Sequence, residues 1–358
     1  MVLINNFPIV SLIIVTYNAA DFIIDCLLSV RNLKYNSFET IIVDNASIDK
    51  TSDIIELHFP SVRIIKSSEN LGFAAGVNLG YSHSKGKYIA LLNPDTKVNS
   101  NWLSKLVLAM EKDEKCGICA SLMLQWGTQV VDTAGDGCTR AGKGYKIGHN
   151  QPASLYKESR DVFTACGGAA LYRRNMLEKI GFFDPDYFLL HEDTDLGFRA
   201  RLAGWTCKYV HNAVVYHRVS ASIGYKSSLA VYHSVKNSDL VWLKNMPGIF
   251  LVLTAPEKFL SDLASFIYLG LIHRKYKEYL RAKFHVSQQI RKIIIKRKEI
   301  QELKKISNKQ LWLMLPPFIS LKHLKRLWQD KNNELKIARC RGDSNTATSK
   351  DFNNHTHP

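Results

Sequence analysis

The 358-residue chain lacks the uninterrupted run of roughly 20 apolar residues that a membrane-spanning helix needs. Its C-terminal apolar segments, 249–255 and 311–321, are ended or broken by proline, so we expect core or interfacial helices there. The N-terminus has no positive region or cleavage site of a signal peptide. Seven cysteines in a chain of this length exclude a disulfide framework. These absences favour a reducing, cytoplasmic setting.

The sequence also lacks internal repeats and two cysteine pairs at the spacing of a zinc site. Cys116 and Cys119 form a single CxxC pair inside an apolar run, and no second pair follows, so we expect both to be core residues. Acidic residues are scarce over 273–337, which holds 18 Lys and Arg but five Asp and Glu, and so carries +13 of the formal charge of +16. We expect this block to touch an anionic membrane surface, with solvated helices as the alternative, and not to bind nucleic acid.

The first 110 residues alternate strand and helix patterns. Residues 9–16 form a continuous, mostly β-branched run that is typical of a strand buried on both faces, and helical spacing follows it. Further strands are expected at 40–43, 62–65, 88–92, 116–124, 164–172, 207–210 and 214–216, with inserted strands and loops over 125–156. The pattern predicts an α/β fold with a mostly parallel sheet, helices on both of its faces and a basic helical extension. The expected division is residues 1–110 and 111–245 as two halves of one domain, 246–337 as basic amphipathic helices and 338–358 as a disordered tail.

Polar residues follow each of the first four predicted strands. They are Thr16, Tyr17 and Asn18, then Asp44 and Asn45, then Asn70 and Gly72, and finally Asn93 and Asp95. Ligands of doubly wound sheets bind at the carboxyl ends of the strands, so this coincidence predicts a nucleotide site.

Three of these positions have a specific chemical interpretation. Asp44 can accept hydrogen bonds from a ribose or a base, although capping the next helix would also explain it. Gly72 and Gly76 near a helix start allow close approach of a ligand, or simply close packing of that helix on the sheet. Asp95 in the Asn-Pro-Asp-Thr turn offers a hard oxygen ligand that suits Mg or Mn.

A cluster of carboxylates begins a predicted helix at 192–195. Such clusters also occur as simple helix caps, and Asp195 stands four residues before Arg199, the spacing of a surface ion pair. The helix dipole would lower the pKa of an aspartate at this position.

Five motifs in order resemble family 2 glycosyltransferases. They are VTYN (15–18), VDNAS (43–47), NLGFAAGVN (70–78), LNPDT (92–96) and FDPDYFLLHEDTDLGFRARLAGW (183–205), and the resemblance covers about residues 8–245. The nearest subgroup is similar to rhamnosyltransferases of surface-polysaccharide assembly. This resemblance implies a GT-A fold, that is, a Rossmann-like sheet with an acceptor-binding second half.

The resemblance also implies roles for individual residues. Asp193 would be the base that takes the proton of the attacking hydroxyl, and Glu192 would orient the acceptor, while Asp195 is assigned to structure. Asn93 stands where the family often has Asp, so Asp95 alone is an anionic metal ligand of this motif. Further implied contacts are Asn78 and Lys236 to the donor, His217 to the metal or diphosphate, and Gly167, Gly168 and Trp205 to the acceptor.

These expectations combine into one function. The chain is expected to be an inverting glycosyltransferase with a UDP- or dTDP-sugar donor, a glycan or polyisoprenoid-linked acceptor, Mg or Mn, and a place at the cytoplasmic face of the membrane. The alternative is an inactive sugar- or nucleotide-binding protein on the same fold. A nucleotidyltransferase would want a Gly-rich, basic loop after the first strand, which residues 15–21 do not provide.

Overall fold

The structure of the protein, a computed structural model, describes residues 9–218 and 227–318. The predicted tail at 338–358 lies outside them. Contacts place the described residues up to 316 in one compact unit.

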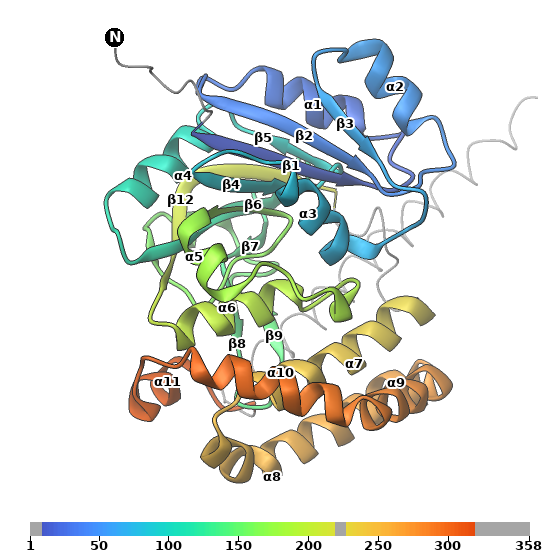
Figure 1. Ribbon diagram of the computed structural model, residues 1–358, viewed down its shortest axis with the longest axis vertical. Helices are drawn as coiled ribbons and strands as arrows, with labels where there is room; N and C mark the ends of the chain where they lie inside the picture. Colours follow the sequence, from blue (N-terminus) through green and yellow to red (C-terminus); the bar gives the residue numbers. More distant parts are fainter. Residues whose placement is uncertain (1–8, 219–226, 319–358) are drawn as a thin grey trace, which may run out of the picture. The chain divides into compact units, whose positions relative to one another are not determined.

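The unit is built on a mostly parallel sheet in the strand order β10-β12-β6-β11-β4-β1-β2-β3 (Figure 1). Strand β11 pairs antiparallel with both of its neighbours, which separates the parallel group β4-β1-β2-β3 from the parallel pair β12-β6. The bounds are β1 (Val10–Thr16), β2 (Phe38–Asp44), β3 (Arg63–Lys66), β4 (Tyr88–Leu92), β6 (Cys116–Gln125), β10 (Arg160–Asp161), β11 (Ala169–Arg173) and β12 (Thr206–His217). Strand β5 (Thr96–Val98) pairs with β12, β7 (Val131–Ala134) pairs with β6, and β8 (Asp136–Cys138) pairs with β9 (Gly144–Lys146).

Helices cover both faces of this sheet, as the alternating pattern predicts. Successive side chains of β1 point to opposite faces, so Leu12 and Ile14 pack in one core and Ile13 and Val15 in another. The first core receives α1 (Ile23–Arg31), α2 (Thr51–His58) and α4 (Trp102–Glu111), and the second receives α3 (Gly72–Ser82), α5 (Arg174–Ile180) and α6 (Glu192–Leu202). Cys116 and Cys119 are fully buried in β6, as expected of core cysteines.

The predicted strands at 207–210 and 214–216 are one strand, β12. A register shift between Val210 and Val214 lets the chain continue along β6 after a local irregularity. The region 125–156 supplies β7, β8, β9 and the short 3₁₀ helix η1 (Ala153–Leu155), which agrees with the inserted strands that its composition predicts.

The C-terminal helices pack on α6. Phe198 and Leu202 of α6 share a core with Leu240 of α7 (Ser228–Asn245), to which residues from both earlier and later parts of the chain contribute. The later helices that contribute are α8 (Gly248–Ser265), α9 (Tyr276–Gln288), α10 (Ile290–Glu302) and α11 (Asn308–Met314), and the π-helix η3 (Phe266–Ile272) lies between α8 and α9. The boundary predicted at residue 245 therefore falls between two helices of the same compact unit.

Helix α3 approaches β1 closely at Gly80. A Cβ atom there would lie 2.6 Å from Ile13 Cγ2 and 3.2 Å from Val43 Cγ2. We predict that Gly80→Ala lowers the free energy of unfolding by about 1–3 kcal/mol, because the overpacking outweighs the better helix propensity of alanine. Gly248→Ala is the control, since the only neighbour near its added Cβ is the end of Arg297, 4.0 Å away. Denaturant unfolding measures both, and equal stability of the two variants would contradict the close packing.

Candidate active site

The carboxyl ends of the parallel strands β1, β2, β3 and β4 lie at one edge of the sheet, and one asparagine joins them. The Asn45 amide donates to Asn70 Oδ1 (3.0 Å) and to the Gly72 carbonyl (3.1 Å), and its oxygen accepts from the Leu71 N–H (2.9 Å). The structure thus brings Asn45, Asn70 and Gly72 together as predicted. Thr16 is fully buried beside them, where its hydroxyl donates to the Val43 carbonyl.

The loops after β1 and β2 are tied to each other. The Asn18 N–H donates to Ser47 Oγ (3.0 Å), and Asn18 Oδ1 accepts from the Ile48 N–H (2.9 Å). Asp44 is buried and accepts from the Ser47 N–H (3.0 Å) and from the hydroxyl of Ser52 in the first turn of α2. These contacts agree with the alternative interpretation of Asp44, in which it caps the helix that follows β2. Tyr17 is 47% exposed at this edge.

Two predicted donor contacts on α3 have other partners. Gly76 faces the sheet, where an added Cβ would lie 2.9 Å from Val15 Cγ1, so close packing explains the glycine. The Asn78 amide binds the Phe183 backbone twice, by donating to its carbonyl (2.7 Å) and accepting from its N–H (3.2 Å). Asn78 thus contacts protein backbone, and Gly76 packs on Val15 near the end of β1, so the donor contacts expected of these two residues stay predictions.

Asp95 is buried in the turn after β4 and faces His217 at the end of β12. His217 Nε2 lies 3.5 Å from Asp95 Oδ2, and His217 Nδ1 lies 2.9 Å from Asp132 Oδ2. Asp95 Oδ1 is buried and has no hydrogen-bond partner among the described residues. Burial lowers the pKa of His217, but hydrogen bonds to Asp132 and Asp95 outweigh it and raise the pKa to about 9.

Sequence reasoning missed Asp132, the residue that holds His217 in place. Asp132 is fully buried on β7 and also accepts from Lys146 Nζ (2.6 Å). Burial alone would raise its pKa, but hydrogen bonds from His149 and His217 and the charge of Lys146 hold it well below its usual value. The strand-end criterion could not find Asp132, because it lies within an inserted antiparallel strand.

Two consecutive glycines connect the Asp95 turn to the acidic helix start. The Asn93 N–H donates to the Gly168 carbonyl (2.8 Å), and the Gly167 N–H donates to Asp193 Oδ2 (3.0 Å). An added Cβ on Gly168 would lie 3.0 Å from the Asn93 amide nitrogen. The backbone of this segment therefore sets the position of Asp193 relative to the donor edge.

Asp193 is a buried carboxyl group at the start of α6. Its other oxygen accepts from the Thr194 N–H (2.6 Å). Burial raises the pKa of Asp193 despite these two backbone bonds, which corrects the lowered value that the helix dipole predicts. Glu192 is also buried, one of its oxygens has no partner in the described chain, and burial together with Asp193 raises its pKa well above the usual value.

A second missed residue, Asp136, stands beside Asp193. Ligand atoms of Asp136, Cys166 and Asp193 all lie within 4.8 Å of one another, so this group has a geometry that could hold a metal ion. Burial and the neighbouring Asp193 raise the pKa of Asp136 to about 7. Such raised values are typical of functional sites, where buried carboxyl groups are brought close together.

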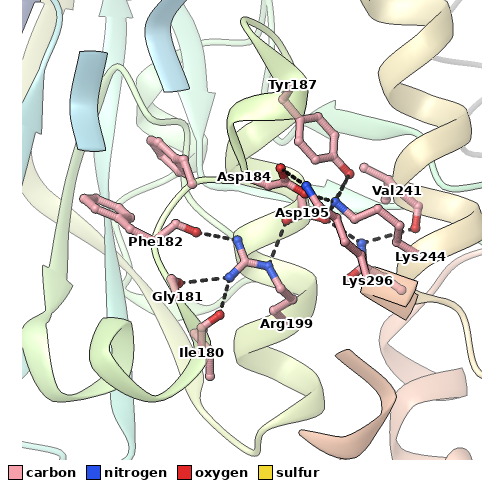
Figure 2. A network of polar contacts seen from close by, with 12 residues as sticks. Ile180, Gly181, Phe182, Asp184, Tyr187, Asp195, Arg199, Val241, Lys244 and Lys296 are labelled. Atoms are coloured by element: carbon pink, nitrogen blue, oxygen red, sulfur yellow. Dashed lines mark hydrogen bonds and ion pairs between the residues drawn. The ribbon is translucent and has the colours of Figure 1, made fainter. Parts of the chain in front are cut away.

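Asp195 is the centre of a buried network that fixes α6 (Figure 2). It accepts from Tyr187 (2.9 Å), Arg199 (2.8 Å) and Asn245 (2.8 Å), and Lys244 Nζ lies 3.2 Å away. Arg199 also donates to the carbonyls of Ile180 (2.6 Å), Gly181 (2.9 Å) and Phe182 (2.6 Å). The Asp195–Arg199 pair is therefore buried, and the surface pair considered from the spacing is excluded.

Lys236 and Trp205 both have partners within the protein. Lys236 Nζ donates to the Asp186 carbonyl (2.7 Å), and the Asn237 amide donates to Tyr187, Leu189 and Leu190, so the middle of α7 holds the 186–190 loop. Trp205 follows the end of α6, where its N–H donates to the Ala200 carbonyl (2.9 Å) and its side chain packs against the second core. The donor contact of Lys236 and the acceptor contact of Trp205 stay predictions.

Comparison with known proteins agrees with this geometry. Residues 11–181 match the family model for glycosyl transferase family 2. The N-acetylglucosaminyl-diphospho-decaprenol L-rhamnosyltransferase of Mycobacterium tuberculosis is 26% identical over 250 residues, which are 63% of this chain and 81% of that protein. The putative glycosyltransferase EpsH of Bacillus subtilis is 26% identical over 221 residues, or 60% of this chain and 62% of EpsH.

Solved structures show the same fold. The mannosyltransferase PcManGT of Pyrobaculum calidifontis, in complex with GDP-Man and Mn²⁺, has a TM-score of 0.51 at 17% identity over 83% of this chain and 84% of its own. GalNAc-T7 with UDP, GalNAc and Mn²⁺ has a TM-score of 0.55 at 18% identity, and the match covers 71% of this chain and 51% of that one. The chain thus has a GT-A fold, and its residues 11–181 match glycosyl transferase family 2, with similarity to rhamnosyltransferases.

The buried position of Asp195 leads to a stability prediction. We expect Asp195→Asn to lower the free energy of unfolding by about 3–5 kcal/mol, because Arg199 and Lys244 would lose their buried counter-charge. Burial alone would raise the pKa of Asp195, but the charges of Lys244 and Arg199 hold it below its usual value. Its contribution is therefore complete above about pH 4 and is lost as the pH falls through the folded pKa.

Thermal unfolding at several pH values measures this difference, with Asp53→Asn on the exposed side of α2 as the control. The gap between wild type and Asp195→Asn should be constant above about pH 4 and shrink below it. A loss no larger than that of the control would contradict the network's structural role.

Proposed function

We propose that the protein is an inverting glycosyltransferase that moves a sugar from a UDP- or dTDP-linked donor to a glycan or polyisoprenoid-linked acceptor, in the synthesis of a cell-surface polysaccharide or glycoconjugate. The observation that carries the proposal is the pair of backbone bonds at Gly167 and Gly168, which link Asp193 to the turn that bears Asp95. The name of the mycobacterial relative, a rhamnosyltransferase for a decaprenyl-diphosphate-linked sugar, supports a lipid-linked acceptor and a rhamnosyl or hexosyl donor.

The donor would lie at the strand edge of residues 1–110, and the acceptor on the side of 111–245. Asp44 and Tyr17 would meet the nucleoside, which is supported by the position of Asp44 at the end of β2 and by the exposed ring of Tyr17 after β1. The interlocked amides of Asn45 and Asn70 would keep the α3 N-terminus in position at the same edge.

The residues present fit a divalent metal, Mg or Mn, at Asp95 and His217. The unpartnered buried oxygen of Asp95 supports this, because a buried carboxylate oxygen normally has a partner. The order Asp132–His217–Asp95 also fits, since metal-bound histidines usually donate their second nitrogen to a carboxylate. When bound, the ion would neutralise charge on the leaving diphosphate.

Asp193 would act as the general base. In the proposed step the acceptor hydroxyl oxygen bonds to the anomeric carbon from the face opposite the nucleoside diphosphate, the bond to the diphosphate breaks, and the hydroxyl proton passes to Asp193. Burial raises the pKa of Asp193, which makes its carboxylate a stronger base than an exposed aspartate. The Gly167 and Thr194 amides hold the carboxylate in one orientation for this transfer.

Substitution of Asp193 tests the assignment. We predict that Asp193→Asn lowers the rate of nucleotide release from the accepted donor, in the presence of acceptor, by about 10²- to 10⁴-fold, while donor affinity stays within about threefold. A panel of UDP- and dTDP-sugars identifies the donor first, and Asp53→Asn is the matched control. Unchanged turnover in Asp193→Asn would remove Asp193 as the base.

Substitution of Asp132 tests the metal assignment without relying on activity. We predict that Asp132→Asn weakens Mn²⁺ binding in the presence of UDP or dTDP by about 10- to 100-fold, because His217 loses the carboxylate that orients it. Isothermal titration of Mn²⁺ measures this, with Asp161→Asn on the exposed strand β10 as the control. Equal Mn²⁺ affinity in wild type and Asp132→Asn would contradict a role of His217 in holding the ion.

A place at the cytoplasmic face of the membrane is part of the proposal, because a polyisoprenoid-linked acceptor is confined there. Among the helices of residues 9–218 and 227–318, none combines the length and apolarity needed to cross a bilayer. Any contact with the membrane through these residues would therefore be made by a surface.

A further inference from the structure

Helix α8 is rotated about its own axis so that the face it buries differs from that of a usual surface helix. In a globular protein such a helix turns its apolar stripe to the core and its polar side to water. The buried residues of α8 are Phe250, Thr254, Lys258 and Ser261, of which three are polar. Its inward face is thus mainly polar, and its apolar residues must lie elsewhere.

The buried polar side of α8 is held by ion pairs. Lys258 Nζ contacts Asp239 of α7 and Asp262 one turn further along α8 (2.7 Å). Lys283 of α9 binds the same two carboxylates, at 2.8 and 2.7 Å. Lys143, from the loop between β8 and β9, reaches the Ser261 carbonyl (3.3 Å) and the Ser265 hydroxyl. These contacts fix the rotation of α8 about its own axis.

The outward face of α8 and η3 is apolar. Its exposed large side chains include Val252 (72% exposed), Phe259 (68%) and Ile272 (64%). The others along these 25 residues are Ile249, Leu253, Leu260, Leu263, Ile267, Tyr268 and Leu271. Pro256 and Ala264 are exposed between them. We call this surface the α8–η3 face.

Exposed apolar side chains continue onto the next two helices. Tyr276, Leu280 and Phe284 recur every four residues on α9, opposite its buried residues Tyr279, Ala282 and Val286. These two helices and the turn before them also carry exposed basic side chains, which include Arg274, Lys277, Arg281, Arg291 and Lys298. Residues 274–305 contain twelve Lys and Arg and three Asp and Glu.

This arrangement is unfavourable while the outward face is in water. Exposed apolar area costs about 25 cal/mol per Å², and taking Lys258 and its carboxylate partners out of water carries a desolvation cost as well. Contiguous apolar surfaces of this kind mark sites that contact another molecule or a membrane. The inverted orientation of α8 is therefore stabilised when its outward face leaves water.

We propose that the α8–η3 face lies in the headgroup and acyl boundary of an anionic bilayer, with the helix axis in the membrane plane. Charge decides between a bilayer and a second copy of the chain, because two copies would bring the same basic helices together, whereas anionic headgroups neutralise them. The proposal goes beyond glycosyl transfer and needs no assumption about the substrate.

The same helices connect this face to the active site. Helix α7 binds α8 through the Asp239–Lys258 pair and binds α6 through Lys244 and Asn245, which contact Asp195. Asp195 lies two residues after Asp193 in the same helix. The candidate base is therefore held at a fixed position relative to the membrane-binding surface, as an enzyme with a lipid-linked acceptor requires.

Vesicle flotation of the full-length protein tests the proposal. Wild type should bind phosphatidylcholine vesicles that contain phosphatidylglycerol, bind pure phosphatidylcholine more weakly, and lose most of the difference at high salt. The variant Val252→Ser/Phe259→Ser/Leu263→Ser should bind the anionic vesicles at least about tenfold more weakly than wild type, because three inserted apolar side chains are lost. All three side chains are exposed, so the variant should keep the wild-type circular dichroism spectrum and unfolding temperature.

The matched control is Leu57→Ser/Leu108→Ser/Leu155→Ser, which removes three exposed apolar side chains from other elements and should bind like wild type. The proposal is overturned if wild type fails to bind anionic vesicles at low salt, or if both triple variants bind like wild type. A dimer that only the first variant dissociates, with vesicle binding unchanged, would instead assign the face to self-association. None of these readouts uses transferase activity, so they are independent of the donor and acceptor assignments.

Discussion

The buried carboxylate of Asp195 is the interaction on which the arrangement of the active site depends. It joins three parts of the chain that are far apart in sequence: the 180–187 segment through Arg199 and Tyr187, helix α6 to which it belongs, and α7 through Lys244 and Asn245 (Figure 2). Lys244 also binds Asp184, and Lys296 of α10 binds both Asp184 and Asp186. A buried ion network of this kind contributes little net stability compared with an apolar core, but breaking it is costly, so it specifies one position for the start of α6.

That position matters because the candidate base stands in the same helical turn. Asp193 faces the Gly167–Gly168 segment, whose backbone also binds the turn between β4 and β5. Donor-side and acceptor-side groups are thus linked through the main chain of Gly167 and Gly168, which donates to the Asp193 carboxylate and accepts from the Asn93 N–H. The carboxyl groups of Glu192, Asp193 and Asp136 are crowded into this small buried volume, and burial raises the pKa of each. Helix α7 contacts α6 through Lys244 and Asn245 and contacts α8 through Asp239. A continuous series of contacts therefore connects the helix that bears the candidate base with the proposed membrane-binding face.

The sequence predicted the parallel half of the sheet well, because strands buried on both faces leave continuous apolar runs and their polar ends share one edge. It also singled out Asp95 and Asp193, which the structure brings to the two ends of the Gly167–Gly168 link. Asp132 and Asp136 escaped notice, since they lie on inserted antiparallel strands whose pairing no local pattern reveals. Trp205 and Lys236 were assigned to the site from the resemblance, and no local pattern revealed that Lys236 binds the 186–190 loop or that Trp205 follows the end of α6. The orientation of α8 could not be predicted either, because one of the two carboxylates that pair with its buried Lys258 is Asp239, on another helix.

The central claim is a single displacement at the anomeric carbon, with Asp193 as base on the face opposite the diphosphate. The most direct measurement is the anomeric configuration of the product by NMR, compared with that of the donor that the enzyme accepts. A single displacement gives the opposite configuration in the first product formed. Retention of the donor's configuration would contradict it, since retention requires either two displacements or attack from the side of the leaving group.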